Sequence, residues 1–385
     1  MSEWKKVKLK DICSDIIDCV NKTAPVCDYE TPYKMLRTSD IRNGQINTEG
    51  LKCVSKETFE KWNRRGYLQK GDVIFTREAP VGEVGWLKDP KNLFLGQRLM
   101  FFRADNKKCD NRFLFYSLFF SDNKRSIIAK SNGSTVNHLR VPDCENIEIY
   151  IPDLHTQQNI ASVLSRYDSL IENYQKQIKL LEEAAQRLYK EWFVDLHFPG
   201  HENTKIVDGV PEGWELSKLG SLAEFKRGKT ITKKDIVDGS IPVVAGGLEP
   251  AYYCNKFNTA ERVITVSGSG ANAGFTRMYF EKVWASDCSY VDWATTPFLH
   301  FVYCYLKDNK TTIDNMQKGA AQPHVYAKDI NALGLCIPTE DVLNIFEIKV
   351  SRYFNTISSL QSQIILLTEA RDRLLPKLMS GEIAV

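Results

Sequence analysis

The sequence contains no run of the roughly 18 consecutive apolar residues that a membrane-spanning helix needs. Its first residues, Met1 to Lys6, are mixed and polar and lack the apolar core of a secretory signal peptide. We therefore expect a cytoplasmic protein. None of the ten cysteines forms a C-x-x-C pair, and they lie scattered between Cys13 and Cys336. In a reducing compartment this scatter predicts free, mostly buried thiols rather than disulfides.

Motifs for metal binding and methyl transfer are also missing. His197 and His201 are four positions apart, but Pro199 and Gly200 between them break the helix that would direct both rings at one metal. A methyltransferase would need a glycine-rich cofactor loop and an Asn-Pro-Pro-aromatic motif, and the chain has neither. We therefore expect no metal, no cofactor and no catalytic residue in this chain.

One segment, 223–230, matches a relaxed phosphate-loop pattern. A phosphate loop needs a strand before it and a long helix after it, so that the helix N-terminus meets the phosphate. Here the β-branched residues Thr230, Ile231 and Thr232 follow, and they favour a strand. We interpret Lys226, Arg227 and Lys229 as a basic loop that could contact nucleic-acid phosphate instead.

Composition allows folded cores, since 43% of the residues are hydrophobic and 11% aromatic, and 385 residues suggest two domains. The net charge of +3 is unevenly spread. Residues 1–150 carry 26 Lys and Arg against 20 Asp and Glu, whereas residues 201–336 carry 15 of each. The first part is thus moderately basic. If the chain binds a polyanion, we expect a partner to supply part of the electrostatic attraction.

The sequence repeats itself once, because residues 151–188 align without gaps with residues 337–374. In this alignment 15 of 38 positions are identical, including Ile151-Pro152 with Ile337-Pro338. Upstream the similarity is weaker and the offset drifts, so that Val73-Ile74 matches Val263-Ile264. Loops of different length explain this drift. Two related domains with divergent loops suggest one task performed on two different targets.

Two long helices are predicted at the ends of the repeats, because apolar residues recur there in alternating steps of three and four. Asp153 and Thr339 are expected N-caps, and the helices are expected to stop at Pro199-Gly200 and at Pro376 followed by Gly381. Arg371 alone interrupts the pattern. The alternative is two ordinary helices, each packed on its own domain. The predicted seam consists of Leu164, Tyr167, Ile171, Tyr174, Ile178, Leu181, Leu188, Val350, Tyr353, Ile357, Leu360, Ile364, Leu367 and Leu374.

The globular parts are predicted to be mixed α/β, with strands at 73–76, 99–102, 147–150 and 263–266 and short helices at 112–120 and 297–306. The expected fold class is α+β: two similar mixed α/β domains joined by two long antiparallel coiled-coil helices, with a pseudo-two-fold internal repeat. We expect the first domain at 1–152, a central spacer helix at 153–198, the second domain at 199–338, and a distal spacer helix with a C-terminal tail at 339–385.

Several segments, in this order along the chain, resemble the specificity subunits of type I restriction-modification systems. The segments are Gly71 to Thr76, Ile151 to Ile160, Glu191 to Asp195, Pro211 to Glu215, Val263 to Ser269 and Leu374 to Ile383. The resemblance extends along essentially the whole chain. It departs at Leu343-Asn344, where the family has paired glutamines.

The resemblance implies a non-catalytic, DNA-binding subunit in which each domain is a target-recognition domain for one half of a bipartite site. It also implies that the helices set the gap between the half-sites and recruit two methyltransferase subunits. Two restriction-translocase subunits are possible further partners. S-adenosylmethionine, ATP and magnesium are then expected in the partner subunits. The alternative is a structural protein with a coiled-coil spacer that binds no DNA.

Candidate DNA-reading residues are polar or basic positions on loops beside the predicted strands, from which side chains can reach base edges. In the first domain they are Arg37, Thr38, Ser39, Thr76, Arg77, Gln97, Arg98, Ser131, Ser134 and Asn137. In the second they are Lys226, Arg227, Lys229, Ser267, Ser269, Asn272, Gln317, Lys318, Gln322 and His324.

Overall fold

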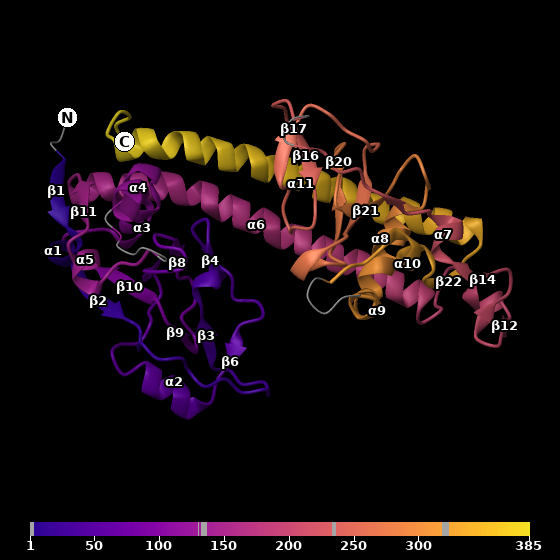
Figure 1. Ribbon diagram of the computed structural model, residues 1–385, viewed down its shortest axis with the longest axis horizontal. Coiled ribbons are helices and arrows are strands. Elements are labelled where there is room, and N and C mark those ends of the chain that lie inside the picture. Colours follow the sequence, from indigo (N-terminus) through magenta and orange to yellow (C-terminus); the bar gives the residue numbers. More distant parts are fainter. Residues whose placement is uncertain (1–3, 130, 132–136, 233–235, 318–322) are drawn as a thin grey trace. The chain divides into compact units, whose positions relative to one another are not determined.

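The computed structural model describes residues 4–129, 131, 137–232, 236–317 and 323–385. The chain divides into two compact units. The first unit comprises Met1–Glu172 and Ile365–Val385, and the second comprises Asn173–Ile364. The structure has two helices of 40 residues, α6 (Leu154–Phe193) and α11 (Glu340–Met379) (Figure 1). Each helix crosses one boundary between the units, α6 at 172–173 and α11 at 364–365. The units therefore cut across the predicted segments 153–198 and 339–385, because each unit takes the start of one helix and the end of the other.

The first unit is built on two sheets and a two-stranded ladder. In the ladder, β1 (Lys5–Lys8) pairs antiparallel with β11 (Glu148–Ile151). The central sheet has the order β2-β10-β7-β8, with β2 at Cys13–Asp18, β10 at Leu99–Ala104, β7 at Val73–Thr76 and β8 at Val84–Trp86. The smaller sheet has the order β6-β3-β9, with β6 at Lys52–Cys53, β3 at Lys34–Leu36 and β9 at Leu93–Leu95; β3 and β9 are parallel.

Short elements complete the first unit. The helices are α1 (Leu9–Ile12), α2 (Lys56–Trp62), α3 (Asn111–Phe119), α4 (Ser121–Ala129), α5 (Val141–Glu145) and the 3-10 turn η1 (Thr38–Asp40), and a small hairpin joins β4 (Ile41–Arg42) to β5 (Gln45–Ile46). The predicted strands at 73–76 and 99–102 and the predicted helix at 112–120 are confirmed as β7, β10 and α3. Phe75 and Phe102 are fully buried and belong with Phe113 of α3 to one hydrophobic cluster. Burial of this sheet face against α3 holds the unit together.

The second unit repeats this plan. Its ladder pairs β14 (Glu215–Lys218) with β22 (Gly334–Ile337). Its central sheet has the order β15-β21-β18-β19, with β15 at Lys226–Arg227, β21 at Cys288–Asp292, β18 at Val263–Ser267 and β19 at Thr276–Tyr279. Its smaller sheet has the order β17-β16-β20, with β17 at Tyr252–Cys254, β16 at Ile241–Val244 and β20 at Trp284–Ala285; β16 and β20 are parallel. The remaining elements are the 3-10 turns η2 (His201–Asn203) and η4 (Gly270–Asn272), strands β12 (Ile206–Val207) and β13 (Val210–Pro211), and helices α7 (Leu219–Leu222), α8 (Leu299–Asp308), α9 (Lys310–Asn315) and α10 (Ala327–Asn331).

Strand pairing gives the correspondence between the two units position by position. In the first unit Val73 pairs with Phe102, and in the second Val263 pairs with Asp292. In the smaller sheets Leu36 pairs with Leu95, as Val244 does with Ala285. One constant offset therefore relates the β7–β10 pair to the β18–β21 pair, which confirms the internal repeat read from the sequence.

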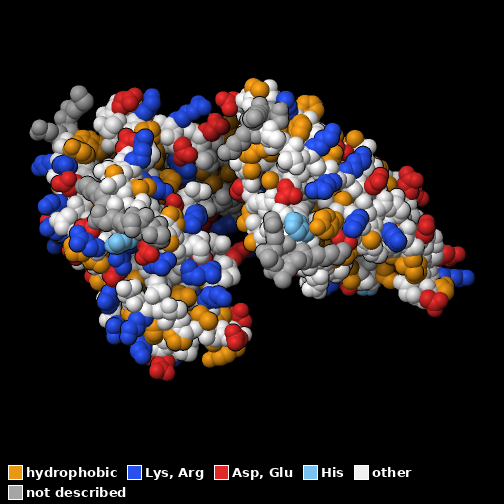
Figure 2. Space-filling view, viewed as in Figure 1, with side chains coloured by type: hydrophobic (Ala, Val, Ile, Leu, Met, Phe, Trp, Pro, Cys, Tyr) orange, Lys and Arg blue, Asp and Glu red, His pale blue; other side chains and the backbone are white. Residues whose placement is uncertain are grey.

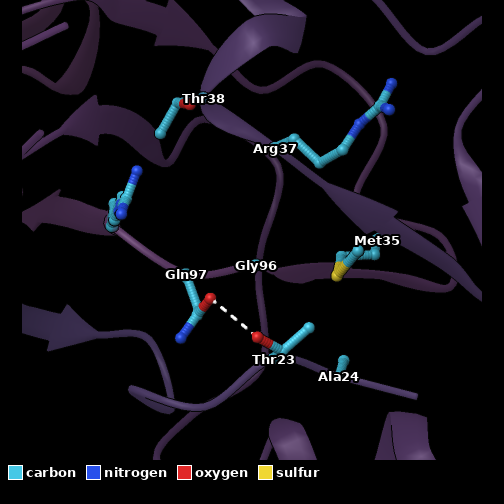
Figure 3. Close-up of a pocket in the computed structure, with 8 residues that line it drawn as sticks. Thr23, Ala24, Met35, Arg37, Thr38, Gly96 and Gln97 are labelled. Atoms are coloured by element: carbon cyan, nitrogen blue, oxygen red, sulfur yellow. Dashed lines mark hydrogen bonds between the residues drawn. The ribbon is translucent and has the colours of Figure 1, made fainter. Parts of the chain in front are cut away.

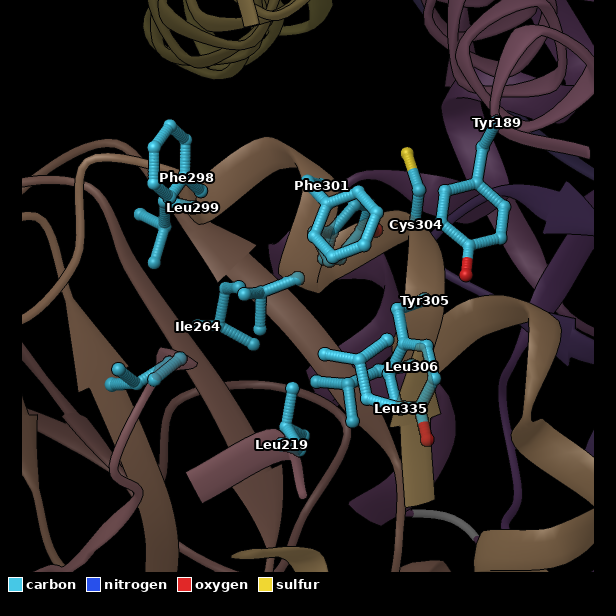
Figure 4. Packing of buried hydrophobic residues seen from close by; sticks show 14 of the residues in the cluster. Tyr189, Leu219, Ile264, Phe298, Leu299, Phe301, Cys304, Tyr305, Leu306 and Leu335 are labelled. Carbon is cyan, nitrogen blue, oxygen red and sulfur yellow. The ribbon is translucent and has the colours of Figure 1, made fainter. Parts of the chain in front are cut away.

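The core of the second unit lies between α8, the central sheet and the long helices. Figure 4 shows Ile264 of β18 facing Leu299 and Phe301 of α8, with Tyr189 of α6 beside Cys304. The rings of Tyr189 and Phe301 lie 5.6 Å apart. The predicted strand at 263–266 and helix at 297–306 are confirmed as β18 and α8, with slightly shifted ends.

Asp153 caps the first long helix as predicted, since its carboxylate accepts a hydrogen bond from the backbone N–H of Thr156 at 3.0 Å. The predicted stop at Pro199-Gly200 lies beyond the observed end of α6, whereas the predicted stop at Pro376 followed by Gly381 is confirmed. Helix α6 ends at Phe193, before Pro199, and Leu196 then adopts a left-handed conformation with φ 61°. Pro376 lies inside α11, because its missing N–H removes only one bond in the last turn. The chain leaves that turn through Gly381, whose φ is 75°.

None of the predicted seam residues is exposed; Leu164, Ile171, Val350, Ile357 and Leu360 are buried. Within the second unit the rings of Trp192 and Phe346 lie 5.8 Å apart, so the end of α6 packs against the start of α11. The first unit has the opposite pairing, with the start of α6 beside the end of α11. Each unit thus contains an antiparallel helix pair.

All ten cysteines lie in the described parts of the chain and are free thiols, six of them buried, as predicted. Among the described residues, no helix has both the length and the apolar character needed to cross a bilayer.

Candidate nucleic-acid interface

A pocket of about 270 Å³ opens in the first unit where β3 and β9 end. Its lining contains four of the residues predicted to read DNA, Arg37, Thr38, Gln97 and Arg98, together with Thr23, Ala24, Met35 and Gly96 (Figure 3). The backbone N–H of Gly96 donates to the carbonyl oxygen of Leu36 at 2.9 Å. A Cβ at position 96 would lie 2.4 Å from that oxygen, so only glycine allows the ends of β3 and β9 to approach this closely.

The cations around this pocket are fixed by neighbouring acids. The guanidinium of Arg37 donates twice to the carboxylate of Asp40, with Nη2–Oδ1 at 2.7 Å and Nε–Oδ2 at 3.0 Å. This bidentate pair raises the pKa of Arg37 above its ordinary value. Arg98 lies 3.3 Å from Glu78, and its side chain is half exposed. Both guanidiniums are therefore held in place while part of each remains open to solvent.

Gln97 lines the same pocket as these two cations. Its Oε1 accepts a hydrogen bond from the hydroxyl of Thr23 at 3.1 Å, and Figure 3 shows the two side chains directed toward one another. The bond orients the amide and leaves its NH₂ group available to a ligand.

Two predicted readers in this unit face inward, which corrects the sequence prediction. Thr76 is fully buried, and its hydroxyl donates to the carbonyl of Pro80 at 2.5 Å. Arg77 is only 15% exposed; it pairs with Asp18 at 2.7 Å and donates to the carbonyl of Leu139 at 3.0 Å. Both Nη atoms of its guanidinium are thus bound within the fold, whereas its buried Nε has no hydrogen-bond partner among the described residues.

The other candidates in the first unit are peripheral. Ser39 lies beside Asp40 and donates its hydroxyl to that carboxylate, Ser131 donates its hydroxyl to the carbonyl of Ile128, and Asn137 is exposed. Ser134 lies outside the described residues.

Sequence reasoning missed a basic segment that adjoins the pocket. Residues 61–70 contain Lys61, Arg64, Arg65 and Lys70 with no acid, and all four cations are exposed. Figure 2 shows Lys and Arg side chains gathered on the first unit around α2, which leads into this segment. The indole N–H of Trp62 donates to the carbonyl of Lys22, next to the pocket residue Thr23. A cluster of cations without an acid would have been a usable sequence signal.

In the second unit the equivalent place is occupied by different side chains. The backbone N–H of Ser286 donates to the carbonyl of Val244 at 2.8 Å, which repeats the bond between Gly96 and Leu36. The next residue, Asp287, is exposed, and its carboxylate accepts a hydrogen bond from the hydroxyl of the predicted reader Ser269. Asp287 was not among the predicted residues. An acidic residue was not expected there, because the candidates were basic or uncharged polar side chains.

His324 lies beside Ser269 in an isolated β-bridge, and its ring stacks on Tyr326 at 5.8 Å. His138, its counterpart in the repeat, makes the matching bridge to Glu78 in the first unit. His138 and His324 align in the internal repeat, and this alignment was a sequence signal for including His138 among the candidate DNA-reading residues.

The remaining candidates of the second unit divide into four groups. Lys226, Arg227 and Lys229 lie on and after the edge strand β15, with no phosphate-loop helix following in the described residues. Gln317 donates to the carbonyl of Ala273, close to Asn272. Ser267 is buried, which corrects the prediction that it reads DNA. Lys318 and Gln322 lie outside the described residues.

Comparison with known proteins agrees with this geometry. A family model described as the type I restriction modification DNA specificity domain matches residues 1–183 and again 211–366. The MjaIX specificity subunit of Methanocaldococcus jannaschii is 29% identical over 413 residues, which cover all of this chain and 94% of that protein. The HindI specificity subunit of Haemophilus influenzae is 22% identical over the whole of both chains.

The fold has a solved counterpart. A type I restriction-modification S subunit from M. genitalium superimposes with a TM-score of 0.59 at 20% identity, covering 98% of this chain and 96% of that one. Together with the two matches of the family model, the repeated two-sheet unit with its share of two long helices defines a DNA specificity protein. The chain belongs to the family of type I restriction-modification DNA specificity subunits.

Proposed function

We propose that each unit reads one half of a bipartite site in double-stranded DNA and that α6 and α11 set the gap between the halves. One observation carries this proposal. The two units share one frame of sheets, yet the positions after the equivalent strands differ in chemistry. Arg37 and Thr38 follow β3, whereas Ala245 and Gly246 follow β16. One frame of sheets that carries different side chains after β3 and β16 suits two different base sequences.

The chain acts with partners that supply catalysis. We assign methyl transfer, with S-adenosylmethionine, to two methyltransferase subunits, and ATP- and magnesium-dependent cleavage to restriction subunits. The nearly neutral net charge of +3 supports shared binding, because a chain with so small a surplus neutralises few phosphates alone. Two equivalent leucines support two partner copies. Leu180 on α6 is 59% exposed, and its counterpart in the repeat, Leu366 on α11, is 64% exposed.

Exchange of residues 199–338 for the matching segment of a relative tests the division of labour. The chimera, expressed with its methyltransferase, should methylate a site in which one half is new and the other unchanged. Sequencing of modified adenines across the genome measures both halves. A chimera that alters both halves would contradict independent readout. A wild-type complex with no sequence preference would favour the alternative, a structural protein with a coiled-coil spacer that binds no DNA.

The leucines provide a separate test of partner number. Leu180→Glu and Leu366→Glu should each remove one methyltransferase copy from the purified complex, because a charge at an apolar contact is costly to bury. The matched controls are Gln177→Glu and Gln363→Glu, which add the same charge at exposed, equivalent positions on the same helices. Mass determination of the complexes would show one copy lost for each leucine and none for the controls. Retention of both copies in the leucine variants would reject this docking site.

A further inference from the structure

Gln97 and Asp287 occupy the same position in the two units. The offset between them is the one that relates Val73 to Val263, fixed by the pairing of β7 with β10 and of β18 with β21. Each follows directly after the backbone bond that joins the ends of the parallel strands, Gly96 to Leu36 and Ser286 to Val244. Each is also oriented by a single hydroxyl, that of Thr23 or of Ser269.

The surroundings of Asp287 leave its carboxylate open to a ligand. Gly246 and Gly268 flank it, and a Cβ on Gly268 would lie 3.2 Å from Oδ1. No lysine or arginine in the described parts of the chain forms an ion pair with it, although Lys226 and Arg227 are exposed in the same unit. An exposed carboxylate on a surface that meets DNA repels phosphate. It therefore disfavours every sequence that does not offer it a hydrogen-bond donor.

The chemistry of the two side chains selects different bases. An ionised carboxylate only accepts hydrogen bonds, whereas an amide both donates and accepts. In the major groove cytosine presents a single amino donor, guanine presents only acceptors, and thymine presents an acceptor and a methyl group. Adenine presents an amino donor beside an acceptor, which suits an amide but places a lone pair against a second carboxylate oxygen.

We propose that Gln97 and Asp287 are equivalent specificity-determining residues, with Asp287 reading the amino group of a cytosine and Gln97 reading an adenine. This inference rests on the proposed function, since it assumes that the surface where the parallel strands of each unit end meets the major groove of DNA. It assigns a base-reading role to Asp287 and one chemical determinant to each half-site.

The decisive experiment uses the full chain with its methyltransferase and a library of duplexes varied at one position at a time. Asp287→Asn keeps an oxygen to accept from Ser269 but adds a donor. It should reduce the preference for cytosine at one position of one half-site by about 5- to 100-fold, the discrimination of one good base contact. The other half-site should be unchanged. Gln97→Glu should shift one position of the opposite half-site from adenine toward cytosine, a gain that loss of folding cannot imitate.

The matched control is Glu261→Gln. Glu261 is an exposed acid just before β18, whereas Asp287 lies beside the other end of that strand, where Ser267 pairs with Cys288. The control removes the same charge and should leave both half-sites intact. Unchanged specificity in Asp287→Asn and Gln97→Glu complexes that still methylate DNA would overturn the assignment. Absence of any preference in the wild-type complex would reject the proposed function itself, so the two failures are distinct.

Discussion

Asp168 of α6 and Arg371 of α11 form an ion pair in the first unit, with Nη1 of Arg371 2.9 Å from Oδ1 of Asp168. The other carboxylate oxygen accepts from Arg112 of α3 at 2.8 Å. Arg371 thus interrupts the apolar pattern of its helix because it meets an acid. The equivalent positions in the repeat hold Phe354 and Ala185, which belong to one hydrophobic cluster in the second unit. The same helix contact is polar in one unit and apolar in the other.

Asp168→Ala should destabilise the first unit by about 2–4 kcal/mol, because the largely buried Arg112 loses its acid and Arg371 keeps only the exposed Asp372. Arg371→Ala should cost less, about 1–2 kcal/mol, since Asp168 keeps its bond from Arg112. Asp372→Ala is the control; its side chain is 53% exposed, and it should cost less than about 1 kcal/mol. Hydrogen exchange of α3 amides in denaturant measures the three values. Equal values for Asp168 and Asp372 would contradict the shared ion pair.

Arg77→Ala should lower the free energy of unfolding of the first unit by about 2–3 kcal/mol, because Asp18 and the carbonyl of Leu139 lose a buried partner. Arg65→Ala is a matched control. Arg65 contacts the same aspartate at 3.1 Å but is 46% exposed, and it should cost under about 1 kcal/mol. Denaturant unfolding followed by tryptophan fluorescence measures both. A stable Arg77→Ala protein that loses preference at a single base would restore Arg77 as a reader.

The buried thiols should resist modification at neutral pH. Burial raises the pKa of Cys144 and Cys288 to about 12, so their thiolates are scarce at neutral pH. Native labelling with iodoacetamide followed by mass spectrometry should modify the partly exposed Cys27 and Cys53 first. Rapid labelling of Cys144 in the folded protein would contradict this order.

The same thiols make stability depend on pH in alkali. Each binds its proton more tightly in the folded state, so stability should fall as pH rises above the ordinary thiol value of about 9 toward 12. Replacement of Cys144 by Ala should reduce that slope by up to about 1.4 kcal/mol per pH unit. Denaturant midpoints measured at a series of alkaline pH values give the slope, and equal slopes for both proteins would contradict the raised pKa.

Lys61→Ala and Arg64→Ala should weaken DNA binding by the same factor for all sequences. Each lost phosphate contact should reduce the slope of log affinity against log salt by about 0.9. Lys56→Ala is the control, because Lys56 is paired with Glu60 on α2 at 3.8 Å. Titrations of the assembled complex at several salt concentrations give the slopes. A change of specificity, or an unaltered slope, would remove residues 61–70 from the phosphate-binding surface.

Insertion of one heptad into both helices tests whether they set the gap. Because the boundaries between the units lie at 172–173 and 364–365, an insertion at both places lengthens the connection and leaves each unit intact. One heptad of helix adds about 10.5 Å, which corresponds to about three base pairs of DNA. The gap in the methylated motif should grow by that amount with both halves unchanged. An unchanged gap with methylation retained would show that the helices are not the spacer.

The fold was predictable from sequence where local patterns decide it. β-branched runs indicated β7 and β18, apolar spacing indicated the seam residues, and the internal alignment indicated the repeated plan. Tertiary contacts decided the rest. Arg77 looks like a free loop cation until Asp18 is placed beside it, and Pro199 indicates a helix stop although α6 already ends at Phe193. Asp287 could have been aligned with Gln97 from the offset that relates Val73 to Val263, but only the strand pairing shows that this offset holds at the end of the parallel strands.

Leu375, Leu378 and Met379 belong to the hydrophobic cluster that also contains Leu9, Phe113 and Leu164. The first unit is therefore completed by a segment that is translated after the whole of the second unit. Until that segment has been synthesised the first unit cannot close, and the apolar side chains that receive the end of α11 lie open to chaperones. A stop codon at position 365 would leave the second unit whole and damage the first. A mutation downstream of the second unit would thus disable the unit whose larger part had been translated before it.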